Sequence, residues 1–453
     1  MSDLSFTIST MKKSVLLILA FLFAITFQAQ QKKWTLQESV VYALENNISI
    51  KQSTLDIEAA DIDRADALGN FIPSLNIQSS LSSNGGLSIN PTNNRFENTR
   101  FTSFSGGASS SLTIFDGLRN LRQLQRAKLA QLSSQYSLEL MKDDIALFVA
   151  NSYLTVLFNK QSLVVLKAQN IVTNDQLKRT TELVDAGVLP KGDLLQIEAT
   201  NADEQQRIIV AENNIQISLI SLAQTLLIKD YQNFDISEDD YEIFGNEILM
   251  QSPYDLIEKA KEERYEIKIA EENKSIAEKD VQLARGAYYP TLTAFYNYNT
   301  RYADNDAFNR DFTTQLYEND GTSYGLQLNI PVLNGFATRN QVQRSKINVK
   351  RAEYQLEQAE LDLEANVYQA YVDAQGSLKA YEAATVALNA QEQAYDYATE
   401  RFNVGLTNAF DFSQAKSRLE IAQTEVVRTK YDYIFKLKVI ELYFGTLVTD
   451  LKF

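Results

Sequence analysis

The chain has 453 residues, no Cys, no His and a formal net charge of −15. The missing side chains exclude a Ser-His-Asp triad, a thiol nucleophile, a disulfide and any imidazole or thiolate metal ligand. The acidic balance makes the phosphate backbone of nucleic acid an unfavourable partner. We therefore expect no catalytic residue, no metal site, no cofactor and no nucleic-acid partner.

The first 29 residues have the pattern of an export signal. Lys12 and Lys13 precede an apolar run over residues 15–27, and the chain turns polar after Ala29. A run of about 13 residues is too short to cross a hydrocarbon core of about 30 Å as a helix. A cleaved signal peptide over 1–29 is therefore favoured over a membrane anchor. Met11 is an alternative start, because residues 1–10 lack signal character.

After the predicted signal, the chain contains the same sequence unit twice in tandem. Three separated blocks recur at an offset of about 217 residues and stay in register over more than a hundred positions. The matched blocks are 67–75 (ALGNFIPSL) with 284–292 (ARGAYYPTL), 114–117 (IFDG) with 332–335 (VLNG), and Gly187 and Asp193 with Gly405 and Asp411. This order predicts a tandem duplication with a first repeat over 30–250 and a second over 251–453.

Each repeat is predicted to open with a helix, over 36–69 or 253–286, and to continue into two strands. In the segment 324–332 (YGLQLNIPV) apolar side chains occupy every second place, which is the pattern of a strand with one apolar and one polar face. The predicted strands cover about 71–83 and 101–115 in the first repeat and about 288–302 and 321–333 in the second. Polar loops join the two strands of each pair.

A very long helical hairpin is predicted to follow the strands of each repeat. Residues 119–185 and 336–403 contain no Pro and only a single Gly. A helix of that length would extend about 100 Å at about 1.5 Å per residue, which is typical of a coiled coil. The hairpins are predicted over 119–228, followed by a linker at 229–250, and over 336–444, followed by a short tail.

Four half-polar strands per chain cannot close a barrel by themselves. An open sheet edge is not tolerated in lipid, and bacterial outer-membrane barrels use an even number of strands, eight or more. Two chains would supply 8 strands and three chains 12. In either case the polar face would line a lumen and the apolar face would meet lipid.

The ordered blocks resemble the TolC family of outer-membrane efflux proteins over essentially the whole chain after the signal. The resemblance is carried by 71–75 (FIPSL), 288–292 (YYPTL), 115–117 (FDG), 333–335 (LNG), 186–189 (AGVL) and 403–407 (NVGLT). It implies an α+β membrane protein, a homotrimer with a 12-stranded outer-membrane β-barrel, and a long α-helical coiled-coil barrel that continues it in the periplasm.

The resemblance also implies a function and partners. The chain would be the passive exit duct of a tripartite efflux or type I secretion system, docked to a periplasmic adaptor and an inner-membrane pump. The adaptor and pump would choose the cargo, whether drug, metal ion or protein. The chain itself would catalyse no reaction.

The resemblance also implies roles for particular residues. Pro73, Pro290, Gly117 and Gly335 would mark the junctions between helix and strand. The periplasmic tips that meet the adaptor would be Gly187, Val188 and Leu189 in the first repeat and Val404, Gly405 and Leu406 in the second. As a local interpretation, Gly187 and Gly405 are C′ glycines that stop the long helices.

Asp193 and Asp411 have two possible roles. As local structure, each is an N-cap of a returning helix. By the resemblance, each belongs to an acidic pore mouth together with Phe402 and Thr407, and three copies of Asp411 would form a negative ring. A relative with two acidic positions has its second where this chain has Gln414, and Thr407 cannot form a charged lock, so gating would differ in detail.

Two other classes of protein fit the sequence less well. A structural trimeric coiled coil on the cell surface would lack paired strands at matched places in a duplicated chain. A periplasmic adaptor would carry one helical hairpin with flanking β-domains, whereas this chain has two hairpins.

Overall fold

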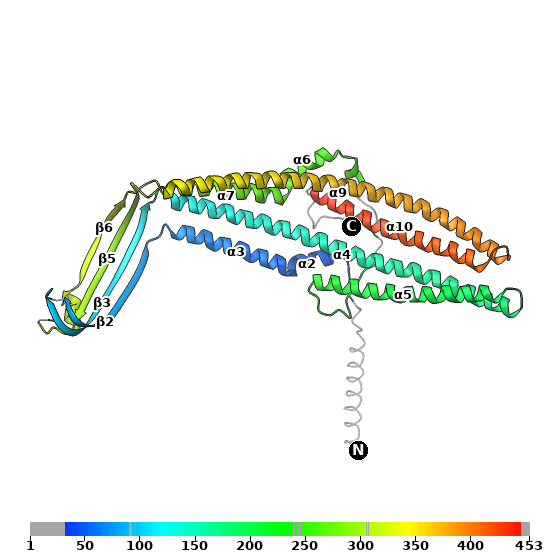
Figure 1. Ribbon diagram of the computed structural model, residues 1–453, viewed down its shortest axis with the longest axis horizontal. Helices are drawn as coiled ribbons and strands as arrows, with labels where there is room; N and C mark the ends of the chain where they lie inside the picture. The colour runs from blue at the N-terminus through cyan, green and yellow to red at the C-terminus, as the bar shows by residue number, and fades with distance from the viewer. Residues whose placement is uncertain are drawn as a thin grey trace, which may run out of the picture. The chain divides into compact units, whose positions relative to one another are not determined.

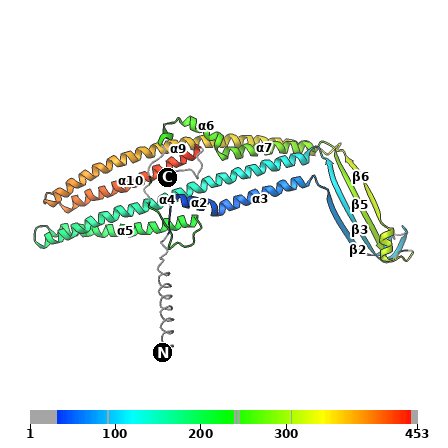
Figure 2. The same cartoon turned by 180° about the vertical axis from the view of Figure 1, so that it is seen from behind.

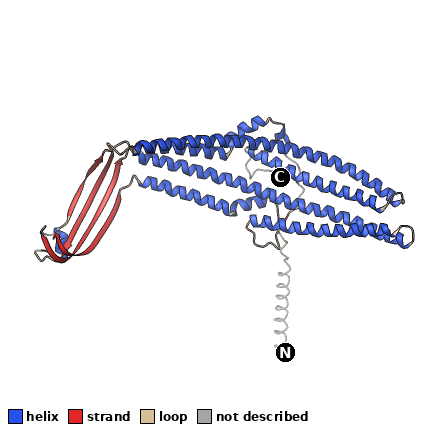
Figure 3. Ribbon diagram, viewed as in Figure 1, coloured by secondary structure: helices blue, strands red, loops and turns tan. Residues whose placement is uncertain are grey.

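The computed structural model describes residues 32–89, 93–238, 241, 246–304, 306 and 308–444. The predicted signal peptide and the last residues of the predicted tail lie outside this set. The described residues divide into two compact units. The first comprises 32–51, 141–263 and 363–444, and the second comprises 52–140 and 264–362. Most of the described chain is helical, and four long strands gather in one sheet (Figure 3).

Figure 1 labels the helices along the chain. They are α2 (Leu36–Asn46), α3 (Ile48–Gly69), α4 (Arg119–Asp185), α5 (Lys191–Thr225), the 3-10 turn η1 (Asn246–Met250), α6 (Pro253–Glu263), α7 (Tyr265–Gly286), α8 (Phe312–Glu318), α9 (Ala337–Asn403) and α10 (Ala409–Tyr443). The two longest, α4 and α9, have 67 residues each. Among the described residues no helix combines the length and hydropathy needed to cross a bilayer.

Each repeat opens with two helices, where the sequence predicted one. Asn47 has extended backbone after α2, and its Oδ1 accepts a hydrogen bond from the N–H of Ser49 at 2.8 Å. The Asn side chain thereby satisfies a free N–H in the first turn of α3. At the matching place of the second repeat, Arg264 has extended backbone (φ −72°, ψ 136°) between α6 and α7. The expected helices over 36–69 and 253–286 are therefore each interrupted.

The sheet contains β2 (Ser74–Ile89), β3 (Phe96–Phe115), β5 (Thr291–Ala303) and β6 (Gly321–Asn329). The strands are antiparallel in the order β2-β3-β5-β6, so the central β3–β5 pair joins the two repeats (Figure 2). The outer sides of β2 and β6 pair with no other described strand. A short parallel pair, β1 (Lys33–Trp34) with β4 (Asp235–Ile236), lies in the other unit.

The register of the sheet separates its side chains into two faces. Residues that are paired across neighbouring strands share a face, and alternate residues of one strand point to opposite faces. One row of partners reads Asn76, Ser109, Asn297 and Ser323, and the next row reads Leu75, Ser110, Tyr296 and Tyr324. We call these the polar face and the apolar face. Large side chains of the apolar face, such as Leu75 and Tyr324, are exposed in the single chain.

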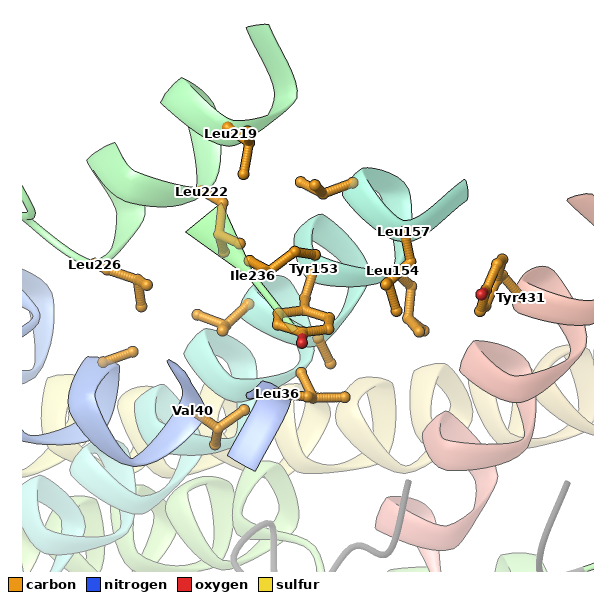
Figure 4. Packing of buried hydrophobic residues seen from close by; sticks show 14 of the residues in the cluster. Leu36, Val40, Tyr153, Leu154, Leu157, Leu219, Leu222, Leu226, Ile236 and Tyr431 are labelled. Atoms are coloured by element: carbon orange, nitrogen blue, oxygen red, sulfur yellow. The ribbon is translucent and has the colours of Figure 1, made fainter. Parts of the chain in front are cut away.

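The largest apolar core lies in the first unit (Figure 4). Leu36, Leu157, Leu222 and Ile236 are almost completely buried there, and they come from α2, α4, α5 and β4. Tyr153 crosses this core, and its hydroxyl oxygen lies 2.9 Å from the carbonyl oxygen of Ser237. The core therefore fastens the predicted linker at 229–250 to the middle of α4.

The predicted polar loop between β5 and β6 contains an unforeseen helix, α8. The Phe312 ring packs 5.0 Å from the Tyr302 ring, centroid to centroid. Gln315 is buried, and it accepts from the Ala303 N–H at 2.9 Å and donates to the Ala303 carbonyl at 3.0 Å. Because Phe312 is joined in docking this helix by an amide and not by further apolar residues, the apolar pattern did not indicate the helix.

Candidate functional site

The first helical tip is a tight turn between α4 and α5. Gly187 has φ +74°, a left-handed conformation that favours glycine. Its N–H donates to the Val184 carbonyl at 2.9 Å, and the Val188 N–H donates to the Leu183 carbonyl at 2.8 Å. These bonds satisfy the last carbonyls of α4. Val188 is exposed and Leu189 is half-buried.

The second tip, between α9 and α10, repeats the same geometry. Gly405 has φ +75°, and the Leu406 N–H donates to the Arg401 carbonyl at 2.8 Å. Val404 and Leu406 are 70% and 69% exposed. No described residue covers these apolar side chains, so the turn presents them at the end of the hairpin.

The interpretation of Asp193 and Asp411 as N-caps is wrong. The N-cap of α5 is Pro190, and Asp193 lies in the first turn of that helix. The N-cap of α10 is Asn408, whose Oδ1 accepts the Asp411 N–H at 2.9 Å. Both aspartates stand three residues after the cap, where a carboxylate still favours the positive end of the helix.

Asp411 is exposed in the first turn of α10. Its Oδ2 accepts a hydrogen bond from the Thr407 hydroxyl at 2.9 Å. Thr407 therefore fixes the direction of the carboxylate and leaves the second oxygen available to solvent. The structure brings these two predicted residues together.

Phe402 is buried behind the tip instead of standing in solvent. Its ring stacks on Phe412 with centroids 5.0 Å apart, and both pack with Ile197 of α5. On the neighbouring surface, Arg179 of α4 donates to the Asn403 side-chain carbonyl at 2.7 Å. These contacts join the two hairpins directly behind their tips.

A buried ionic network on α4, α5 and α10 was missed by sequence reasoning. Lys416 Nζ lies 2.7 Å from Glu204 Oε1, and each side chain is 3% exposed. Lys416 Nζ also donates to the Gln169 carbonyl at 2.5 Å, and Thr173 donates to Glu204 at 2.9 Å. Burial lowers the pKa of the Lys416 ammonium, while its hydrogen bond to Glu204 acts in the opposite direction.

A signal for this network was present in the sequence. Lys416 falls four residues after Phe412 and three before Leu419, on the apolar stripe of α10. A charge at such a position requires a buried partner. The spacing does not say which carboxylate of another helix supplies that partner.

The four junction residues lie between a helix and a strand. Pro73 and Pro290 immediately precede β2 and β5. Gly117, with φ +74°, and Gly335, with φ +59°, lie between the end of a strand and the start of α4 or α9. At Gly117 a Cβ atom would stand 2.3 Å from the Gly286 carbonyl oxygen, so this turn also requires the close approach of another backbone.

Comparison with known proteins identifies the class to which this arrangement belongs. The family model for outer membrane efflux proteins matches residues 40–226 and 256–445, one match for each repeat. The chain belongs to the outer membrane efflux protein family. It is an outer-membrane efflux channel protein, and it is not an enzyme.

Individual relatives are distant but cover most of the chain. Outer membrane protein TolC of Vibrio cholerae is 26% identical over 327 residues, 71% of each chain. TolC of Escherichia coli is 22% identical over 449 residues, 96% of this chain and 87% of its own. These matches confirm the predicted resemblance.

Two solved structures share the fold. VceC from Vibrio cholerae superposes with a TM-score of 0.76 at 16% identity, covering 90% of this chain and 96% of that chain. The Campylobacter jejuni CmeC outer membrane channel gives a TM-score of 0.76 at 18% identity, covering 90% and 85%.

Proposed function

We propose that three copies of this chain form a 12-stranded barrel that continues into a helical tunnel in the periplasm. The observation that carries this proposal is the four-stranded sheet with one apolar face and two free edges. In lipid each free edge would leave N–H and C=O groups without partners. Pairing of β6 in one copy with β2 in the next removes every edge.

The number of copies is tested by cross-linking. The chain has no Cys, so a Cys pair introduced on β2 and β6 has no background. Ser80→Cys combined with Ser323→Cys, both on the polar face of an edge strand, should give a ladder that ends at three chains. The separate single variants should give no ladder. A ladder that ends at two chains would contradict the 12-stranded barrel and favour eight strands.

The helical tips are the proposed docking surface for a periplasmic adaptor, which would link the channel to an inner-membrane pump. The exposed apolar side chains at the tips, Val188, Val404 and Leu406, support this role because such groups are unfavourable in water. Leu406→Glu or Gly405→Asp should abolish efflux in a drug-susceptibility assay and leave the oligomer intact. Met250→Glu, at an exposed apolar residue of η1, is the matched control.

The pore mouth is the proposed place of cation preference. Copies of Asp411 around the axis would form an acidic ring, with Asp193, Phe402 and Thr407 nearby in the same narrow region. Asp411→Asn keeps an acceptor for Thr407 and removes the charge. The reversal potential in a planar bilayer should then move toward zero. If it does not move, Asp411 has only its local role in α10.

A surface coiled coil or an adaptor is not favoured. The family match covers both repeats, including the strands, and the relatives are outer-membrane proteins.

A further inference from the structure

A hollow lies where the central strands of the sheet meet the helices. The turn before α4 and the end of α7 enclose a cavity of about 320 Å³. We call it the junction pocket. Its walls include Phe115, Leu118, Arg122, Gln282, Arg285 and Tyr289. The residues from the α7 end recur at intervals of three and four, so they share one side of that helix.

Two glycines bring the pocket's two walls together. A Cβ at Gly117 would lie 2.3 Å from the Gly286 carbonyl oxygen and 2.9 Å from the Tyr289 Cβ. A Cβ at Gly286 would lie 2.3 Å from the Arg119 side chain. The close contact between the two backbones therefore requires glycine at both positions, and it sets the distance between the pocket's walls.

The junction pocket opens on the apolar side of the sheet. Phe115 is the register partner of Leu292, and Leu292 is the partner of Leu328, so all three belong to the apolar face. A separate cavity of about 710 Å³ is lined by other residues of these two helices, such as Arg119 and Asp280, and by residues of α9. In a channel of the outer membrane the apolar face meets lipid, and the helical end of the sheet is its periplasmic end.

The pocket is also distant from the seams between copies. It lies at the helical ends of β3 and β5, and each of these strands is separated from the neighbouring chain by an edge strand, β2 or β6. Closure of the barrel through its edges therefore leaves the pocket open to the membrane.

The charges in the pocket are uncompensated. Arg285 is exposed and forms no ion pair with any described residue, and Arg122 donates only to the Gln125 side-chain carbonyl at 2.8 Å. Gln282 Oε1 is buried and has no hydrogen-bond partner in the described part of the chain. The pocket therefore offers two guanidinium groups and one unmet acceptor between apolar walls.

We propose that the junction pocket binds the headgroup of a membrane phospholipid from the leaflet that faces the periplasm. Guanidinium groups pair with phosphate oxygens through two parallel hydrogen bonds, so Arg122 and Arg285 hold the phosphate. A donor on the headgroup, an ammonium or a hydroxyl, meets Gln282 Oε1. The acyl chains run upward along Phe115 and the apolar face, while Tyr289 lies at the interface that aromatic residues favour.

The test uses the purified oligomer, stripped of lipid in detergent and titrated with phosphatidylethanolamine or phosphatidylglycerol. Native mass spectrometry counts the lipids bound. We expect the wild-type protein to bind either lipid, and Arg122→Gln/Arg285→Gln to weaken binding at least tenfold. Arg344→Gln, in the larger cavity, should bind like wild type. Because Arg285 is exposed, Arg285→Gln alone provides a folded variant that should weaken binding severalfold.

Two results would overturn the proposal. In one, the arginine variants bind lipid as tightly as wild type and Arg344→Gln do. In the other, inorganic phosphate at millimolar concentration displaces the lipid fully, which identifies a site for free phosphate. Neither result affects the cross-linking ladder that tests the barrel.

Discussion

Removal of the buried ammonium at Lys416 should destabilise the helical unit strongly. In Lys416→Met the Glu204 carboxylate stays buried, because its side chain is 3% exposed, and it loses its cationic partner. Breaking one side of a buried ion pair costs about 3–5 kcal/mol, since the remaining charge is uncompensated. With a urea dependence of about 2 kcal/mol per molar, the unfolding midpoint should fall by about 2 M.

The chain contains a natural probe for this measurement. Trp34 is its single Trp, and its ring packs 5.0 Å from Tyr42 in the same unit as Lys416. Its fluorescence in urea therefore reports the unfolding of that unit. Lys178→Met is the matched control, because the Lys178–Asp175 pair is 3.7 Å apart and more than 70% exposed. Its loss should cost less than about 1 kcal/mol.

A second variant separates charge from packing. Lys416→Met/Glu204→Gln removes both charges and keeps an acceptor for Thr173, so most of the lost stability should return. A buried, uncompensated Glu204 is refuted as the cause if Lys416→Met shifts the midpoint no more than Lys178→Met does. It is equally refuted if the double variant is as unstable as the single one.

Three further outcomes are expected. Gly117→Ala should abolish the heat-modifiable band of the outer-membrane fraction on a gel, because the new Cβ would clash with the Gly286 carbonyl. Gly335→Ala has open space around it, so it should cost only about 1–2 kcal/mol of stability through backbone strain. Asn408→Ala should lower the thermal midpoint of α10 by removing a cap worth about 1 kcal/mol, and an unchanged midpoint would reject Asn408 as the cap. The Arg310 guanidinium holds the pKa of Asp306 at about 2, below its ordinary 3.8, so the stability it contributes to the loop before α8 is complete above pH 3.8 and is lost as the pH falls through about 2. A nitroxide at Tyr317→Cys should therefore gain mobility in that window, and no change with pH would contradict the Asp306–Arg310 contact.

Patterns of spacing predicted the regular parts of this fold. Residues 119–185 contain no Pro and no Gly, and nothing interrupts α4 over that stretch. Alternation over 324–332 predicted the exposed apolar face of β6 because its period equals that of the strand. The break at Asn47 was missed because a single Asn, although a weak helix residue and a good N-cap, also occurs inside helices and does not by itself mark a break.

The parts that were missed depend on contacts between distant segments. Aspartate is favourable at an N-cap and also in the first turn, so composition could not separate Asp411 from Asn408 as the cap. Lys416 finds Glu204 212 positions away, and that pairing exists only after α5 and α10 pack. The docking of α8 likewise depends on the amide of Gln315 and on the backbone of Ala303. Local periodicity carries no information on such partners.

The polar face of the sheet has a consequence for how long a solute would stay in a barrel built from it. Over Ser103–Thr113 and Thr291–Ala303 its side chains are hydroxyls, amides and small groups, with Phe295 as the one large apolar side chain and Arg301 as the one charge. Apart from Phe295 and Arg301, these groups offer a passing molecule the same hydrogen bonds that water offers, so a solute gains little by stopping beside them. We expect residence times close to those of free diffusion and very weak cargo affinity. A lumen wall with little affinity for the cargo favours its rapid release.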